Sequence, residues 1–341
     1  MILKQTWQRL SLLGVIGVIV ASCSAEPPPP PLRVGVNPWP GYSPLYLARS
    51  LNYYPEGTVQ LVDLPSTTEV TRASRNGDLD VVAIPLDELL QIATTRPQIR
   101  AIVVADISAG GDVILGRAPA RSVQDLRGKR VGVESSALGA YVLARALQLA
   151  DMDVADVQVV PLSVAEQEQA FRDGQIDAVV TFDPVRSQLV QAGAVTLFDS
   201  RKIPGEIVDV LAAEAPLLEK RLEDVQGLVQ GWSRAVAYLK ENPKDAVQRM
   251  APARGMTPEQ LQQALQLLHT PPASEVYTML NAQGQGSLVP TLERLGRMMI
   301  DHKLLPIAPP DSASLLDPRA LPPESRDRAA GQPQTQPQGQ P

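Results

Sequence analysis

Short aliphatic runs without polar alternation recur through the first two thirds of the chain, and stretches that read as helices separate them. Examples of such runs are Arg33–Val36, Val81–Ile84 and Ala178–Val180. A run of this kind is typical of a parallel strand that is buried on both faces. The alternation of strand and helix predicts an α/β fold whose parallel strands are joined by right-handed crossovers.

Several phrases of the sequence occur twice, in the same order and at nearly one spacing. The phrase RVGV begins at Arg33 and again at Arg130, and the phrase Arg-x-Gly-x-aliphatic-Asp begins at Arg75 and again at Arg172. Both offsets are 97 residues (130 − 33 and 172 − 75). This period is too long for a solenoid repeat. It predicts two copies of one α/β module.

The repeated residues have a structural explanation. Gly77 and Gly174 each follow a predicted helix, where a residue in the left-handed conformation commonly ends the helix at little steric cost. The spacing Ser-x-x-Glu that begins at Ser66 and at Ser163 fits a capping box at the start of the same helices. We therefore interpret these positions as evidence of duplication and not as a binding site.

The chain beyond the second copy is mostly helical, and no third copy follows. Proline and glycine separate the candidate helices. The candidates lie at residues 217–240, 245–250, 258–268 and 288–300. Residues 308–341 are rich in Pro, Gln and Ser, with few large apolar side chains after Leu321, so we predict a disordered tail there.

The N-terminal segment has the pattern of a targeting signal. Lys4 and Arg9 precede the apolar run Leu10–Val20, which is too short to span a bilayer as a helix. The run ends at Cys23 in a sequence that resembles the lipobox of bacterial lipoproteins. The resemblance implies a signal peptide over residues 1–22 and a lipid on the Cys23 sulfur; the alternative is an ordinary signal peptide with an incidental cysteine. Residues 23–31 end in a run of prolines typical of a stiff spacer.

Composition and charge argue against several classes of function. The formal net charge is −6, and a mildly acidic chain offers no basic face to nucleic acid. Cys23 is the single cysteine, so no disulfide forms within the chain. His269 and His302 lie in the helical region, and no Ser-His-Asp or metal-ligand spacing is present. We expect no catalytic residue, no metal and no cofactor.

Taken together, the duplicated modules, the lipobox and the helical end resemble the substrate-binding proteins of ABC importers, of the nitrate, sulfonate, taurine and bicarbonate type. The phrases that carry the resemblance are RVGVNPWPGYSPLYLAR, RNGDLDVVAIP, DLRGKRVGVESSALGAYVLARAL and FRDGQIDAVVTFDPV. The resemblance implies the two-lobed type II periplasmic-binding-protein fold. Lobe 1 would comprise residues 32–117, lobe 2 residues 118–206, and residues 207–307 would return to lobe 1. The crossings between lobes are expected near Gly116–Val123 and Lys202–Val208.

The resemblance also implies a function. The protein would be an exported, lipid-anchored monomer that captures a small molecule between its lobes. It would deliver that molecule to ABC permease and ATPase subunits. One alternative is a receptor module that reports its ligand to a membrane sensor. A second is an enzyme on the same fold, like the thiamine-pyrimidine synthases or a chorismate-processing dehydratase, in which Asp87 or Asp183 would be the acid–base group.

The ligand site can be located from the strands themselves, because ligands of open α/β sheets bind beyond the carboxyl ends of the strands. Closure of two lobes would bring these loops together around a small molecule. The candidate ligand-binding residues are Trp39, Gly41, Tyr42, Thr67, Thr68, Pro85, Asp87, Asp112, Ser135, Ser136, Phe182 and Asp183.

Several of these candidates also have a structural explanation. Trp39 either contacts the ligand or fills the rim of its lobe. Ser135 and Ser136 either cap a helix or hold an anionic group of the ligand. Asp87 and Asp183 either cap helices or favour a cationic or donor-rich group of the ligand. Asp112 is either a hinge residue or a wall of the cleft.

The charge of the selected loops bears on the kind of ligand. They contain Asp87, Asp183 and Glu134 but no Arg or Lys. Oxyanion binders can use neutral donors, so a small organic anion stays among the candidates. Aromatic and carboxylate side chains together fit an amine or a nitrogen heterocycle, such as a thiamine precursor, better.

Overall fold

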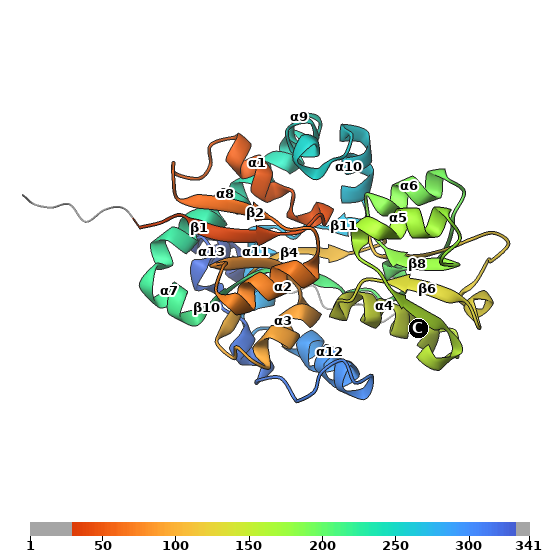
Figure 1. The fold of residues 1–341 in the computed structure, drawn as a ribbon. Helices are drawn as coiled ribbons and strands as arrows, with labels where there is room; N and C mark the ends of the chain where they lie inside the picture. The colour runs from red at the N-terminus through yellow and green to blue at the C-terminus, as the bar shows by residue number, and fades with distance from the viewer. Residues whose placement is uncertain (1–28, 332–341) are drawn as a thin grey trace, which may run out of the picture. The chain divides into compact units, whose positions relative to one another are not determined.

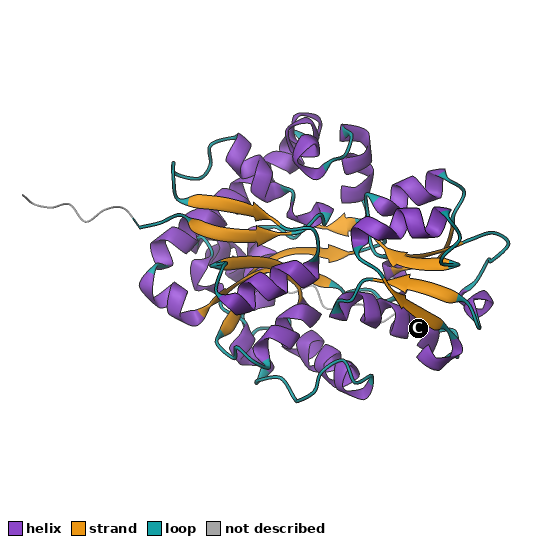
Figure 2. Ribbon diagram, viewed as in Figure 1, coloured by secondary structure: helices purple, strands orange, loops and turns teal. Residues whose placement is uncertain are grey.

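The computed structural model describes residues 29–331. The predicted signal peptide and the lipidated Cys23 lie outside these residues. The strands form two sheets flanked by helices, as Figure 2 shows. The α/β prediction and the type II binding-protein fold are therefore confirmed. We call the six-stranded sheet with its helices lobe 1 and the five-stranded sheet with its helices lobe 2.

Lobe 1 is built on a mixed sheet with the strand order β11-β4-β10-β3-β1-β2. The strands β1, β2 and β3 are parallel, whereas β10 is antiparallel to β3 and β4. The strand bounds are β1 Leu32–Val36, β2 Val59–Asp63, β3 Val81–Pro85, β4 Ile99–Ser108, β10 Val208–Glu214 and β11 Leu268–His269.

Lobe 2 repeats this plan with the order β7-β6-β8-β5-β9. Here β6 is parallel to β7 and β8, and β5 is antiparallel to β8 and β9. The strand bounds are β5 Val113–Gly116, β6 Arg130–Val133, β7 Gln158–Pro161, β8 Ala178–Thr181 and β9 Val195–Asp199.

The helices fall into two groups along the chain (Figure 1). Six connect the strands of the two modules: α1 Pro44–Ser50, α2 Thr67–Asn76, α3 Leu86–Ala93, α4 Ala137–Gln148, α5 Val164–Arg172 and α6 Val185–Gln191. The others follow β10: α7 Ala215–Lys220, α8 Leu222–Glu241, α9 Pro243–Met250, α10 Pro258–Leu265, α11 Ala273–Leu280, α12 Val289–Asp301 and α13 Pro323–Gly331. Apolar residues of α8, α9 and α10 cover α1, and α12 contacts α3.

The predicted duplication is confirmed in the pairing of the strands. Val34 lies opposite Val81 in lobe 1, and Val131 lies opposite Ala178 in lobe 2, so the two modules have the same register. The equivalent glycines of β1 and β6 also have the same reason to be glycine. A Cβ on Gly132 would lie 2.6 Å from Ile176, and one on Gly35 would collide with Leu79.

A second duplicated contact explains the Asp of the repeated phrase. The carboxylate of Asp80 accepts hydrogen bonds from the backbone and guanidinium of Arg33, and Asp177 does the same for Arg130. Each arginine also donates to the carbonyl of the helix-ending glycine, Gly77 or Gly174. Each phrase therefore ties the end of a helix to the start of the first strand of its module.

The first crossing between the lobes lies earlier than predicted. Because β4 ends at Ser108 in lobe 1 and β5 begins at Val113 in lobe 2, the chain crosses at residues 109–112, not at Gly116–Val123. The short apolar run of β5 pairs with β8 and β9, so it belongs to lobe 2. The second crossing lies between β9 and β10.

The prediction of a disordered tail from residue 308 is wrong for the described part, residues 308–331. Leu315 is fully buried, and Leu316 pairs with Ala101 of β4 in an isolated bridge. The helix α13 packs on α11. The sequence did not indicate that this segment is ordered, because its few leucines are separated by prolines and form no periodic face. Each of these leucines is nevertheless buried.

Leu315→Ala tests this correction. Because the substitution leaves a cavity beside β4, we expect it to lower the free energy of unfolding by about 2–5 kcal/mol. The matched control is Ile307→Ala, since Ile307 is 57% exposed and should change stability by no more than about 0.5 kcal/mol. Urea unfolding followed by circular dichroism measures both. Equal stability of the two variants would contradict the docked segment.

Candidate functional site

The loop after β1, residues 37–42, encloses two carboxylates of lobe 1. The indole Nε1 of Trp39 donates to Asp106 at 3.1 and 3.3 Å, and the hydroxyl of Tyr42 donates to Asp209. Gly41 is required here because a Cβ would collide with the Asp106 carboxylate. The aromatic side chains of this loop therefore donate hydrogen bonds to carboxylates of their own lobe.

Four buried aspartates form one cluster: Asp87, Asp106, Asp112 and Asp209. Asp106 on β4 and Asp209 on β10 lie opposite each other in the sheet. Burial is the main cause that raises the pKa of Asp106 to about 8 and that of Asp112 to about 7. Burial and the neighbouring carboxylates hold the pKa of Asp87 and Asp209 well above the usual range.

Two oxygens of this cluster have no hydrogen-bond partner. They are Oδ2 of Asp87 and Oδ2 of Asp112, and both atoms are buried. Buried polar atoms are nearly always paired, so each exception calls for an explanation.

The two lobes meet through hydrogen bonds at the starts of two helices. The backbone N–H of Ala137, the first residue of α4, donates to Glu88 Oε1 at 2.7 Å. In the opposite direction, Glu134 of lobe 2 lies near the start of α2, where Thr67 and Thr68 oppose the rise that burial causes in its pKa, although its Oε1 has no hydrogen-bond partner. Thr68 Oγ1 also donates to the Ser135 carbonyl at 3.2 Å.

An aromatic contact adds to this junction. The rings of Trp39 in lobe 1 and Phe182 in lobe 2 pack edge to face, with centroids 5.4 Å apart. Trp39 also lies beside Gly111 in the first crossing, where a Cβ would lie 2.8 Å from the indole. The prediction that loops from the two lobes come together is therefore consistent with the structure.

Eight of the predicted site residues divide into two sets by the contacts that they make. Trp39, Thr68, Ser135 and Phe182 take part in contacts between the lobes. The second set has partners within one lobe: Tyr42 binds Asp209, Thr67 accepts from Asn37, Ser136 caps α4, and Asp183 accepts from the backbone and hydroxyl of Ser187. For Asp183, these contacts at the start of α6 agree with the alternative that it caps a helix.

Asp112 lies in the first crossing, as the hinge alternative supposes. Its backbone N–H donates to Ser108 Oγ at 3.2 Å, and its carbonyl accepts from the backbone N–H of Ser200 in the second crossing. Asp87 lies in the first turn of α3, two residues after Pro85, which is the N-cap of that helix.

Sequence analysis missed Asp106, Asp209 and Glu88. The first two are lone charges inside otherwise apolar strands, and this departure from a continuous hydrophobic run was the available signal. Glu88 follows the predicted Asp87 in the sequence, and its side chain is buried. No sequence pattern pairs it with α4, because the contact joins the two lobes.

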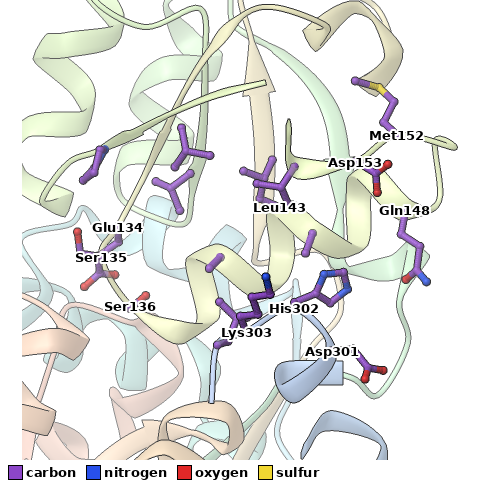
Figure 3. Close-up of a pocket in the computed structure, with 17 residues that line it drawn as sticks. Glu134, Ser135, Ser136, Leu143, Gln148, Met152, Asp153, Asp301, His302 and Lys303 are labelled. Carbon is purple, nitrogen blue, oxygen red and sulfur yellow. The ribbon is translucent and has the colours of Figure 1, made fainter. Parts of the chain in front are cut away.

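A cavity of about 600 Å³ lies on the side of lobe 2 (Figure 3). It extends from Glu134, Ser135 and Ser136 along one side of α4 to β7, and residues 301–304 at the end of α12 also line it. Its volume is within the range of small-molecule sites. The four clustered aspartates do not line it, so the cavity and the acidic cluster are separate features.

Two further tests concern only residues 29–331. In that range, no group of three or more His, Cys, Asp or Glu side chains is placed to hold a metal ion. No helix of this part of the chain is long and apolar enough to cross a membrane.

The buried acids predict an unusual dependence of stability on pH. Groups whose pKa is raised by folding stabilise the protein fully below their unfolded pKa, near 4, and this stability is lost as pH rises towards 8. We expect the free energy of unfolding to fall between pH 5 and pH 8, by at most about 1.4 kcal/mol per pH unit for each proton released.

Asp112→Asn should make this fall less steep, because the amide does not titrate, whereas Asp78→Asn at an exposed position should leave the slope unchanged. Urea unfolding over this pH range is the measurement. Stability that is constant or rises towards pH 8 would show that the four acids are not held protonated by burial.

Relatives of the chain include named binding proteins. A protein of Escherichia coli K12 named as an aliphatic sulfonates-binding protein is 24% identical over 280 residues, which cover 78% of this chain and 84% of the relative. A binding protein of Brucella abortus is 30% identical over 157 residues, covering 43% of this chain and 48% of that protein.

Solved structures share the fold at low identity. The alkanesulfonate-binding protein SsuA of Xanthomonas axonopodis bound to MOPS matches with a TM-score of 0.72 at 20% identity, over 84% of this chain and 98% of that one. The desulfurization enzyme DSZB matches with a TM-score of 0.64 at 17% identity, over 87% and 99% of the two chains. The same fold thus occurs in binding proteins and in an enzyme. The model of the NMT1-like family matches residues 25–253, and the chain belongs to this family.

Proposed function

We propose that the chain is the solute-binding component of an ABC importer, which captures a small molecule between its two lobes and presents it to the permease. The observation that carries this proposal is the junction between the lobes, where loops from the carboxyl ends of β1, β3, β6 and β8 come together. Such loops are the usual ligand site of open α/β sheets. The named binding proteins among its relatives support the same function.

We infer that the ligand contacts Trp39 and Asp87 and lies among Gly41, Thr68, Ser135 and Phe182. Their side chains or backbones are close to the junction, and Asp87 keeps an oxygen without a partner. Binding there would favour the closed arrangement, because a ligand shifts an equilibrium towards the state that it contacts better. We further propose that the protein is exported, acts as a monomer and is held at the membrane by a lipid on Cys23.

Two other functions use the same fold. A receptor module would bind its ligand in the same way but pass the signal to a membrane sensor. An enzyme would need an acid–base group at the junction, and Asp87 is the candidate since burial keeps its pKa high. The structural likeness to the enzyme DSZB supports keeping an enzyme as an alternative.

Cross-linking of the full chain in its native membranes tests the transport function. We expect cross-links to a membrane permease and its associated ATPase, which increase when the importer is active. Cross-links to a sensor kinase alone would contradict the proposal in favour of signalling. Steady conversion of a co-purified small molecule would support the enzyme alternative instead.

Cys23→Ala tests the lipid anchor separately. Because the thioether to the lipid forms on this sulfur, we expect the variant to leave the membrane fraction, while thermal unfolding of the lobes stays unchanged. Fractionation and intact-mass measurement follow the result, with Ser24→Ala as the control. An acylated, fully membrane-bound Cys23→Ala protein would exclude this anchor.

A further inference from the structure

Each lobe places a carboxylate at the start of a helix of the other lobe. Glu88, next to β3 in lobe 1, accepts from the first N–H of α4 in lobe 2. Glu134, next to β6 in lobe 2, lies near the start of α2 in lobe 1, where Thr67 and Thr68 lower its pKa against the effect of burial. Both carboxylates are buried. The exchange is reciprocal, as the duplication of the two modules allows.

This exchange has a consequence for anionic ligands. The N–H groups and the dipole at the start of a helix are the common binding place for an oxyanion. At this junction, the carboxylate of Glu88 takes that place at α4, and the carboxylate of Glu134 lies near the start of α2. An oxyanion would have to displace a buried carboxylate and would then face the four aspartates of the cluster.

Two of the four aspartates of the cluster have a carboxylate oxygen without a hydrogen-bond partner. Trp39 donates to Asp106 and Tyr42 donates to Asp209, so these two acids have partners. The Oδ2 atoms of Asp87 and Asp112 have none, although both side chains are more than nine-tenths buried. The strand register holds the cluster together, because Asp209 lies opposite Asp106 and also opposite Pro85, two residues before Asp87, and Asp112 adds to the raised pKa of Asp87. What this pair lacks is a hydrogen-bond donor, and a positively charged one most of all.

We propose that the site between the lobes selects a small organic cation, whose protonated nitrogen donates hydrogen bonds to Asp87 and Asp112. This inference rests on the proposed solute-binding function and names the class of its ligand. The face and edge of Trp39 and Phe182 would border the apolar part of the molecule. Without ligand, burial keeps the pKa of both acids high, so the pair gains a charge-assisted partner only when the cation enters.

Skeleton-matched ions test the proposal directly. The probes are benzylammonium with phenylmethanesulfonate, and butylammonium with butanesulfonate, each titrated at pH 8 while the thermal unfolding midpoint of the full chain is measured. We expect at least one ammonium ion to raise the midpoint with a Kd of about 1 mM or tighter, and neither sulfonate to do so.

Substitutions then assign the contact. Asp87→Asn and Asp112→Asn should each weaken binding of the ammonium ion by about tenfold or more, because each removes a charged acceptor. Asp317→Asn is the matched control, since Asp317 is also buried but is paired with Arg319, away from the cluster, and it should bind like the parent. If one of the two variants does not fold, the other carries the test.

Three results would overturn the proposal. The first is stabilisation by a sulfonate, which leaves the solute-binding function in place and removes the cation. The second is binding of an ammonium ion with unchanged affinity in both aspartate variants. The third is no response to either ammonium ion up to about 10 mM. The cross-links to the permease decide the proposed function independently of all three.

Discussion

The burial of carboxylates at the junction of the two lobes is the constraint on which the rest of the site depends. Asp106 and Asp209 are opposite each other in the sheet, and Asp87 and Asp112 complete the cluster. A buried charge is costly unless it is paired. These carboxyl groups are therefore either protonated and neutral, or ionised and paired with a cation. The aromatic loop after β1 is shaped by this constraint, because Trp39 and Tyr42 supply donors to two of the acids.

Duplication supplies the geometry that brings these groups together. The Arg33–Asp80 and Arg130–Asp177 contacts hold each module in the same arrangement, so the loops after equivalent strands point to equivalent places. Two such modules facing each other give the reciprocal contacts of Glu88 and Glu134 with the opposite helices. The contact of Glu88 with α4 therefore occupies a backbone N–H group at a helix start, where an anionic ligand would otherwise bind.

Sequence alone predicted the parallel strands of the two modules, their duplication and the loops that follow these strands, since hydrophobic runs and a repeated spacing are local signals. It placed the first crossing too late because the short run Val113–Gly116 fits either sheet. It missed Asp106 and Asp209 because their meeting depends on the pairing of β4 with β10 across about a hundred residues. It also misjudged residues 308–331, where single buried leucines such as Leu315, and not a periodic face, anchor the chain.

The central claim, that a cation completes this acidic junction, is tested most directly by counting protons during binding. Calorimetric titration of benzylammonium at pH 7 in two buffers of different ionisation enthalpy gives that count. Because Asp106 has a pKa of about 8 and Asp112 of about 7, a bound cation should favour their ionised forms and release protons to the buffer. Proton uptake, or binding with no proton change, would contradict the account.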